Sequence, residues 1–433
     1  MDLTRYRLGD IATVDISGVD KKTTPGEKSV RLCNYVDVYH NYAITKDFIS
    51  SFMIASANSV ELDTFSLRKG DVAITKDSET RDDLGASTYI VEDFDEDVVL
   101  GYHTALIRPD NEVLDSSYLN ALLNTTLYKT YWFNNASGSG QRYTLSQDVI
   151  EDLPLFLPDI KVQRRVGEYF SLLEKRAALC RRENKVLKDR IKQLYDYWFV
   201  QFDFPNADGK PYKSNGGKME WNETLKRDIP AGWDFKSLSS YLQFNQSGEW
   251  GEDSLPHGIE VHCVRGADII EMIGAPIRYI APNKSDKLLA SSDIIVEISG
   301  GSPTQATGRS NYVTKTLLSY YNDAMTCSNF CQVLRLKNRD IAPYFFMSWQ
   351  LLYDNGNMFH YEGKTSGLKN LQIDTLLSES WYFPPSELIK SFASFFNEAQ
   401  AKINNNLILI HELEQLRAFL IPLATTGQAT IAT

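Results

Sequence analysis

The sequence predicts an α+β fold in which two mixed α/β domains are joined by two long helices that form an antiparallel coiled coil. Three observations predict it. Motifs of the first half recur in the same order in the second half, which indicates an internal pseudo-two-fold repeat. Each half ends in a long segment with heptad spacing. The 433 residues are also too many for one ordinary hydrophobic core.

The repeat is visible as an ordered series of short matches. The segment ALIR at 105–108 corresponds to QVLR at 332–335, an offset of 227 residues. The segment SGQR at 139–142 corresponds to SGLK at 366–369 at the same offset. One such match could be chance, but an ordered series indicates a duplication.

Apolar residues at alternating steps of four and three predict one coiled-coil helix at the end of each half. The seam residues predicted for the first helix are Phe170, Leu173, Ala177, Asn184, Leu187, Ile191 and Leu194. Those predicted for the second helix, each 222 positions later, are Phe392, Phe395, Ala399, Asn406, Leu409, Leu413 and Leu416. A buried Asn lowers stability but fixes register, so we expect the two Asn residues to meet in an antiparallel pair.

These patterns predict the domain organisation. We expect a first domain over 1–159, a helix over 160–200, a linker over 201–227, a second domain over 228–385, a second helix over 386–425 and a tail over 426–433. The linker carries the turn-forming residues Pro, Asn and Gly. Within the domains, β-branched runs predict strands, and 117–133 and 342–352 predict helices.

Composition excludes several classes of protein. No stretch is long and apolar enough to cross a bilayer, the first residues do not resemble an export signal, and the five cysteines are scattered. We therefore expect a cytoplasmic protein. The net charge of −11 argues against a strongly basic nucleic-acid binder, although residues 160–200 carry 11 Lys and Arg against 5 Asp and Glu. Any polyanion must be held by local patches.

Signals for catalysis are weak. The segment GSGQRY at 138–143 begins like a dinucleotide-binding loop but lacks its third glycine. The segment FPPS at 383–386 has two prolines, but it lacks the acceptor and the aromatic residue of a methyl-transfer signature. We predict no catalytic residue and no metal site.

Polar loops recur at matched places in the two halves. Residues 75–85 follow a predicted strand, and 299–309 follow the corresponding one. The second pair is 137–143 and 363–370. Their glycines permit close approach to a ligand, and their Ser, Thr, Gln, Lys and Arg side chains can bond phosphates and base edges. Because the residues differ between copies, we expect the copies to recognise different features.

With these residues in view, the chain resembles the specificity subunit of type I restriction-modification systems. Segments 6–11, 74–85 and 101–109 resemble motifs of a target-recognition domain in that family, 197–221 its central spacer, and 416–428 its repeated closing motif. The resemblance implies two target-recognition domains that each bind one half of a split sequence in double-stranded DNA. It further implies that two methyltransferase subunits dock on the helices, and that restriction and translocase subunits join the full assembly.

The resemblance places activity in those partners, so the chain would be non-catalytic and hold no cofactor. S-adenosylmethionine, ATP and Mg²⁺ would belong to the partner subunits. The alternative from another class is an interaction scaffold with two ligand-binding domains and no DNA role.

Within this frame we predict DNA contacts from the polar loops. In the first half they are Lys76, Ser78, Thr80, Arg81, Gln141, Arg142 and Tyr143. In the second half they are Ser302, Thr304, Gln305, Thr307, Arg309, Lys364, Lys369 and Asn370.

Overall fold

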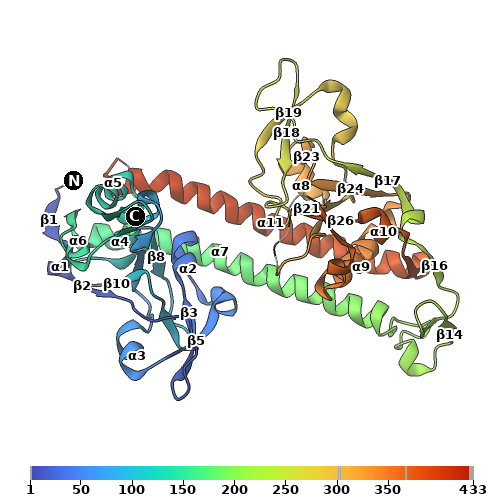
Figure 1. Ribbon diagram of the computed structural model, residues 1–433, viewed down its shortest axis with the longest axis horizontal. Coiled ribbons are helices and arrows are strands. Elements are labelled where there is room, and N and C mark those ends of the chain that lie inside the picture. Colours follow the sequence, from blue (N-terminus) through green and yellow to red (C-terminus); the bar gives the residue numbers. More distant parts are fainter. Residues whose placement is uncertain (1, 301, 303, 366–367, 429–433) are drawn as a thin grey trace. The chain divides into compact units, whose positions relative to one another are not determined.

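The computed structural model describes residues 2–300, 302, 304–365 and 368–428, without the side chains of 364, 365 and 368. The chain divides into two compact units. Unit 1 consists of Met1–Arg182 and Glu412–Thr433, and unit 2 of Glu183–His411. The long helices α7 (Ile160–Tyr195) and α11 (Ser386–Thr425) therefore each contribute residues to both units (Figure 1).

Unit 1 is built on four small sheets. Their strand orders are β1-β13, β2-β10-β6-β8-β4, β11-β12-β7 and β5-β3-β9. The strands are β1 Thr4–Arg7, β2 Ala12–Ile16, β3 Lys28–Cys33, β4 Ala43–Ile44, β5 Met53–Ala57, β6 Val72–Thr75, β7 Asp77–Ser78, β8 Ser87–Ile90, β9 Val98–Leu100, β10 Thr104–Pro109, β11 Ser137–Ser139, β12 Arg142–Thr144 and β13 Pro154–Leu157. The helices are α1 Leu8–Ile11, α2 Tyr35–His40, α3 Ser59–Phe65, α4 Ser116–Leu123, α5 Thr126–Asn135 and α6 Gln147–Glu151.

Unit 2 repeats this plan, with the orders β16-β27, β17-β24-β20-β22, β21-β26-β25 and β19-β18-β23. The strands are β16 Asp234–Ser237, β17 Leu242–Ser247, β18 Ile259–Val264, β19 Ile277–Ile280, β20 Ile294–Glu297, β21 Ser299–Gly300, β22 Ser310–Tyr312, β23 Met325–Cys327, β24 Cys331–Leu336, β25 Glu362–Thr365, β26 Leu368–Leu371 and β27 Ser380–Phe383. The helices are α8 Lys315–Tyr320, α9 Ala342–Asp354 and α10 Ile373–Ser378. The matching sheets confirm the predicted internal repeat.

The repeat extends to strand direction and to ion pairs. Strand β3 pairs with β9 in parallel, and β18 pairs with β23 in parallel, whereas most other pairs are antiparallel. Arg108 donates to the buried Asp71 at 3.0 Å in unit 1, and Arg335 donates to the buried Asp293 at 2.7 Å in unit 2. Because a buried carboxylate needs a partner, each pair fixes a strand against the turn that precedes its neighbour.

The helices α7 and α11 run antiparallel within unit 2. Asn184 accepts a hydrogen bond from Nδ2 of Asn406 at 2.8 Å, and the rings of Tyr195 and Phe392 lie 5.9 Å apart. Residue numbers thus rise along one helix as they fall along the other. The predicted contact between the two Asn residues is present, and both side chains are buried. In unit 1, Arg417 of α11 pairs with Glu174 of α7.

The predicted seam is wrong in part on α11. Leu416 is 39% exposed and does not lie in a buried seam. Phe396 is buried instead of the predicted Phe395, which is half-buried. A straight α-helix has 3.6 residues per turn, so a strict heptad stripe drifts around it over several turns.

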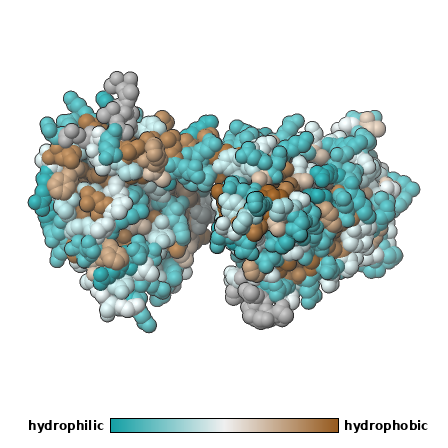
Figure 2. All heavy atoms as spheres, turned by 90° about the horizontal axis from the view of Figure 1, so that it is seen from above, coloured by the Kyte–Doolittle hydropathy of each residue, from teal (hydrophilic) through white to brown (hydrophobic). Residues whose placement is uncertain are grey.

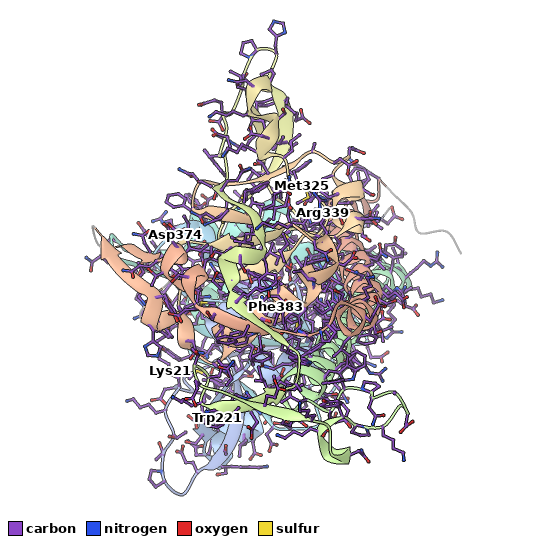
Figure 3. The ribbon with its side chains drawn as sticks, turned by 90° about the vertical axis from the view of Figure 1, so that its right-hand side faces the viewer. Lys21, Trp221, Met325, Arg339, Asp374 and Phe383 are labelled. Atoms are coloured by element: carbon purple, nitrogen blue, oxygen red, sulfur yellow. The ribbon has the colours of Figure 1, made fainter. Side chains whose placement is uncertain are left out.

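Two local expectations also differ from the structure. The helix predicted over 117–133 is two helices, α4 and α5, because the side chain of Asn124 donates back to the Asn120 carbonyl at the end of α4 and the chain turns there. The segment predicted as a linker over 201–227 contains β14 (Met219–Asn222), which forms a hairpin with β15 (Arg227–Pro230) just beyond it. Its Trp221 is 56% exposed, whereas Phe383 of β27 is buried (Figure 3).

Candidate nucleic-acid interface

The small sheet β11-β12-β7 brings together the two polar loops of the first half. Ser78 of β7 pairs with Tyr143 of β12, and Asp77 pairs with Thr144. The hairpin of β11 and β12 pairs Ser139 with Arg142, so Gln141 lies in its turn. Residues more than 60 positions apart in sequence thereby form one polar surface.

Asp77 is the centre of this surface, and its side chain is only 10% exposed. Lys76 donates to both of its carboxylate oxygens at 2.8 Å, and His103 Nδ1 lies 2.8 Å from Oδ2. Nη2 of Arg142 lies 3.3 Å from the same oxygen. Burial opposes ionisation, but hydrogen bonds from Lys76, Thr144 and His103 outweigh it and hold the pKa of Asp77 well below its usual range. Asp77 is therefore a carboxylate surrounded by donors.

Arg142 is the exposed member of the cluster, with 61% of its side chain exposed. Its Nη2 donates to His103 Nδ1 at 2.8 Å as well as to Asp77. His103 reaches this position from a left-handed backbone conformation, φ 68°, at the residue before β10. Nδ1 of His103 lies 2.8 Å from both Asp77 Oδ2 and Arg142 Nη2, so it can donate to the carboxylate or accept from the guanidinium, but not both at once.

The remaining first-half candidates surround the cluster. Arg81 lies over the ring of Tyr143, with its guanidinium carbon 4.9 Å from the ring centroid, and this cation–π contact stiffens both side chains. The hydroxyls of Thr80 and Ser78 donate to Asp83 at 2.8 and 3.3 Å. These bonds tie the 75–85 loop to itself.

Unit 2 has the corresponding sheet, β21-β26-β25. Asn370 pairs with Ser299, and Lys369 pairs with Gly300. This register makes Lys369 equivalent to Tyr143, an offset of 226 rather than the 227 inferred from the sequence match. The ladder of hydrogen bonds, which sequence letters alone do not show, decides the register.

Polar side chains in this second sheet are engaged with neighbours. Nζ of Lys369 lies 2.9 Å from Glu362 and 5.0 Å from the centroid of the Phe359 ring. Burial raises the pKa of Glu362, but hydrogen bonds from Lys369 and Thr307 outweigh it and lower the pKa. The hydroxyl of Ser299 donates to the Asn370 side chain.

Two second-half predictions need correction. Thr307 is wrong as a direct contact, because it is fully buried and its hydroxyl donates to Glu362 at 3.3 Å. Arg309 is occupied by a bidentate pair with the buried Glu297, at 2.7 and 2.6 Å, and by the Gly266 carbonyl. Both residues stabilise the loop from its buried side. Position in a polar loop does not distinguish such supports from exposed side chains.

The other predicted residues of this loop are better placed for contact. Thr304 and Gln305 are exposed, and Gln305 and Ser302 close a short turn through backbone hydrogen bonds. The side chain of Lys364 lies outside the described part of the chain. Sequence reasoning missed Asp77 and His103, because their importance comes from contacts between distant segments.

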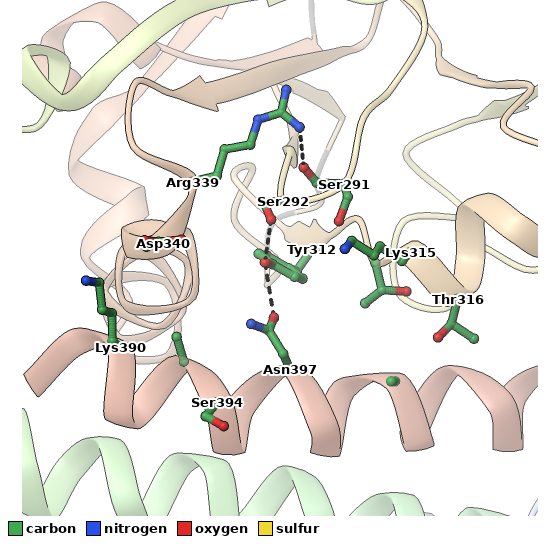
Figure 4. Close-up of a pocket in the computed structure, with 13 residues that line it drawn as sticks. Ser291, Ser292, Tyr312, Lys315, Thr316, Arg339, Asp340, Lys390, Ser394 and Asn397 are labelled. Atoms are coloured by element: carbon green, nitrogen blue, oxygen red, sulfur yellow. Dashed lines mark hydrogen bonds between the residues drawn. The ribbon is translucent and has the colours of Figure 1, made fainter. Parts of the chain in front are cut away.

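A polar pocket in unit 2 lies where the domain meets α11 (Figure 4). The Tyr312 hydroxyl lies 2.9 Å from Ser292 Oγ and 3.3 Å from Oδ1 of Asn397 in α11, and its single proton is donated to one of these two oxygens at a time. Arg339 donates to the Ser291 carbonyl at 3.0 Å. These bonds join the sheet β17-β24-β20-β22 to the helix. The polar side chains of the pocket therefore serve to hold the domain on α11.

Within the described residues, no three His, Cys, Asp or Glu side chains are placed to hold a metal ion. The five cysteines are buried and unpaired. Among the helices of the described chain, none has the length and apolar character needed to span a bilayer. The face seen in Figure 2 is largely hydrophilic, with apolar residues in small groups.

The fold thus places one small polar sheet in each unit, β11-β12-β7 and β21-β26-β25. Residues 2–189 match the family model described as the type I restriction modification DNA specificity domain. The specificity subunit of the type I restriction enzyme MjaIX from Methanocaldococcus jannaschii is 21% identical over 328 residues, 73% of this chain and 69% of that protein.

A solved S subunit of a type I restriction-modification system from M. genitalium has the same fold. It aligns with a TM-score of 0.54 and 14% identity over 98% of this chain and 96% of that chain. Residues 2–189 thus match the DNA specificity domain of type I restriction-modification systems, and the chain is similar to the specificity subunits of these systems. This confirms the resemblance, and a scaffold without a DNA role is not favoured.

Proposed function

We propose that each unit reads one half of a bipartite DNA target. The observation that carries the proposal is the repeat of the three-stranded polar sheet, β11-β12-β7 in unit 1 and β21-β26-β25 in unit 2. The strands of the two sheets pair in corresponding registers, but their side chains differ, as expected if the two units recognise different half-sites. A duplex has antiparallel strands, so a pseudo-two-fold protein can present related surfaces to both half-sites.

In this proposal α7 and α11 set the spacing between the half-sites and dock two methyltransferase subunits. Both helices contribute residues to each unit, which supports this role. On α7, Leu172 and Leu179 are 62% and 54% exposed, and Val186 follows seven residues later at 51%. An exposed apolar stripe flanked by Lys and Arg suits a partner protein.

Catalysis is assigned to the partners in this proposal. The methyltransferase subunits supply S-adenosylmethionine, the restriction subunits use ATP and Mg²⁺, and the complex acts on DNA in the cytoplasm. The net charge of −11 supports this division, because phosphate neutralisation supplies most non-specific DNA affinity. The isolated chain should bind DNA weakly and with strong salt dependence, and nanomolar binding at physiological salt would refute this.

The test of bipartite reading is to map modified sites for the complex with its methyltransferase. Gln141 in unit 1 and Gln305 in unit 2 supply one test residue per unit, since both are exposed, although their loops do not correspond. Replacing Gln141 by Ala should relax sequence preference in one half-site only, and replacing Gln305 by Ala should relax the other. Relaxation of the same half by both variants, or an undivided target, would contradict the proposal.

A further inference from the structure

The helices α7 and α11 begin with equivalent segments that are buried in their own units in the same way. Phe170 in unit 1 and Phe392 in unit 2 are both fully buried, and Ala177 and Ala399 are buried as well. Each pair is 222 residues apart, so the offset of the sequence repeat also holds for burial. This offset identifies the residue of α11 in unit 2 that is equivalent to each residue of α7 in unit 1.

The exposed sides of these two segments differ in apolar character. Leu172 and Leu179 of α7 are largely exposed, and they lie on one side of the helix because seven residues make about two turns. Their equivalents on α11 are Ser394, which is exposed, and Ala401, which is partly buried. Both line the polar pocket of unit 2, which has a volume of about 560 Å³ (Figure 4). The helix therefore presents two leucines to solvent in unit 1 and borders a polar hollow in unit 2.

The charges beside these positions differ as well, and two of them are reversed. Arg165 and Arg176 are exposed on α7, and their equivalents Glu387 and Glu398 are exposed on α11. The segment 164–182 carries six Lys and Arg against two Asp and Glu, whereas its equivalent in α11 carries two of each. We call the exposed side of α7 in unit 1, with its leucines and arginines, the α7 surface, and its equivalent in unit 2 the α11 surface.

Two copies of one methyltransferase present the same docking surface to this chain. A partner surface that is complementary to exposed leucines flanked by arginines is apolar, with acidic side chains at its rim. At the equivalent positions of unit 2 that surface meets a polar hollow and two carboxylates. It buries less apolar area there, and like charges repel. The two contacts therefore differ in free energy.

We propose that the two methyltransferase docking sites are unequal, and that the α7 surface binds the first copy through an apolar face of the partner with an acidic rim. The α11 surface binds the second copy more weakly. This inference rests on the proposed function of the two helices as docking sites. It adds the chemistry of the partner's surface and an order of assembly, in which the complex with one methyltransferase forms before the complex with two.

The experiment titrates the full chain with its methyltransferase. Native mass spectrometry counts the copies bound, and calorimetry gives the two dissociation constants. The wild type should form the one-to-one complex first, with constants that differ about 10-fold or more, as expected for the loss of one strongly contributing side chain. Raising the salt concentration should weaken the tighter step more than the weaker one, because opposite charges meet only in the tighter step.

The leucines are tested by giving α7 the residues that α11 already carries. The double variant Leu172→Ser with Leu179→Ala should lose the tighter step, so that both copies bind with the weaker constant. Its melting temperature should be retained, because both leucines are largely exposed. Leu127→Ser is the matched control, since Leu127 is an exposed leucine of unit 1 that lies on α5 and outside both long helices. It should change neither step.

The charges are tested by a gain of affinity, which damage to the fold does not produce. Glu398→Arg gives α11 the charge that Arg176 supplies on α7, and it should tighten the weaker step while the tighter one is unchanged. Arg176→Glu is the reverse exchange and should weaken the tighter step.

The outcomes separate the two levels of the proposal. If the full chain binds no methyltransferase, or if none of the helix variants changes either step, the proposed docking function itself fails. If the wild type binds two copies with equal constants, or if the leucine variant affects only the weaker step, unequal docking is overturned while docking on the helices stands. If the chain alone forms a dimer that the leucine variant dissociates, the α7 surface binds a second copy of this chain and the proposal is overturned.

Discussion

Replacing Asn184 by leucine tests the polar contact that fixes the register of α7 and α11 in unit 2. Asn184 is 5% exposed, accepts from Asn406 at 2.8 Å and donates to the Ile403 carbonyl at 3.3 Å. The variant removes one member of a buried amide pair, and among the described residues Asn406 keeps its bond to Glu183 at 2.8 Å. A buried polar group that loses its partner costs about 1–3 kcal/mol.

This cost predicts a measurable change in melting temperature. A domain of 150–250 residues loses about 2–4 °C per kcal/mol, so Asn184→Leu should lower the transition of unit 2 by roughly 2–12 °C. The double variant Asn184→Leu with Asn406→Leu replaces both partners by apolar groups and should recover much of the loss. Calorimetry of the four proteins in the cycle gives the coupling energy, expected at about 0.5–3 kcal/mol.

Asn405→Leu provides the control, because Asn405 is exposed on the same helix next to Asn406. It should shift stability by less than about 0.5 kcal/mol. If the losses of the two single variants simply add in the double variant, the amides are not coupled and the reasoning about register is refuted.

Two further predictions concern buried carboxylates. Asp293→Asn leaves Arg335 without its charge partner and should lower the free energy of unfolding by about 3–5 kcal/mol. Asp71→Asn should destabilise unit 1 in the same way, because Arg108 loses its partner. Thermal unfolding measures both effects, and an unchanged melting temperature would contradict the pairing. Because donors lower the pKa of Asp77 from its ordinary value of 3.8, its contribution to stability is complete above about pH 5 and is lost progressively as the pH falls below it. The stability difference between the wild type and Asp77→Asn should therefore shrink between about pH 5 and pH 3, and a constant difference would contradict the assignment.

Loop composition predicted part of the candidate site but not which of its side chains are exposed. The two polar loops of the first half were predicted as a ligand surface, and the structure joins them in one sheet through β7 and β12. Loop position alone did not separate Arg142, which is largely exposed, from Thr307, which is fully buried. Burial depends on what packs from other segments, and sequence letters within one loop do not carry that information.

The sequence by itself determined the duplication, the two heptad helices and the pairing of Asn184 with Asn406, because repeats and helical periodicity are local patterns that survive without coordinates. Only the tertiary structure decided that the seam leaves Leu416 exposed, that the second hairpin is shifted by one residue, and that Asp77 and His103 hold Arg142. Helix drift, strand register and contacts between distant segments all arise when the chain packs in three dimensions.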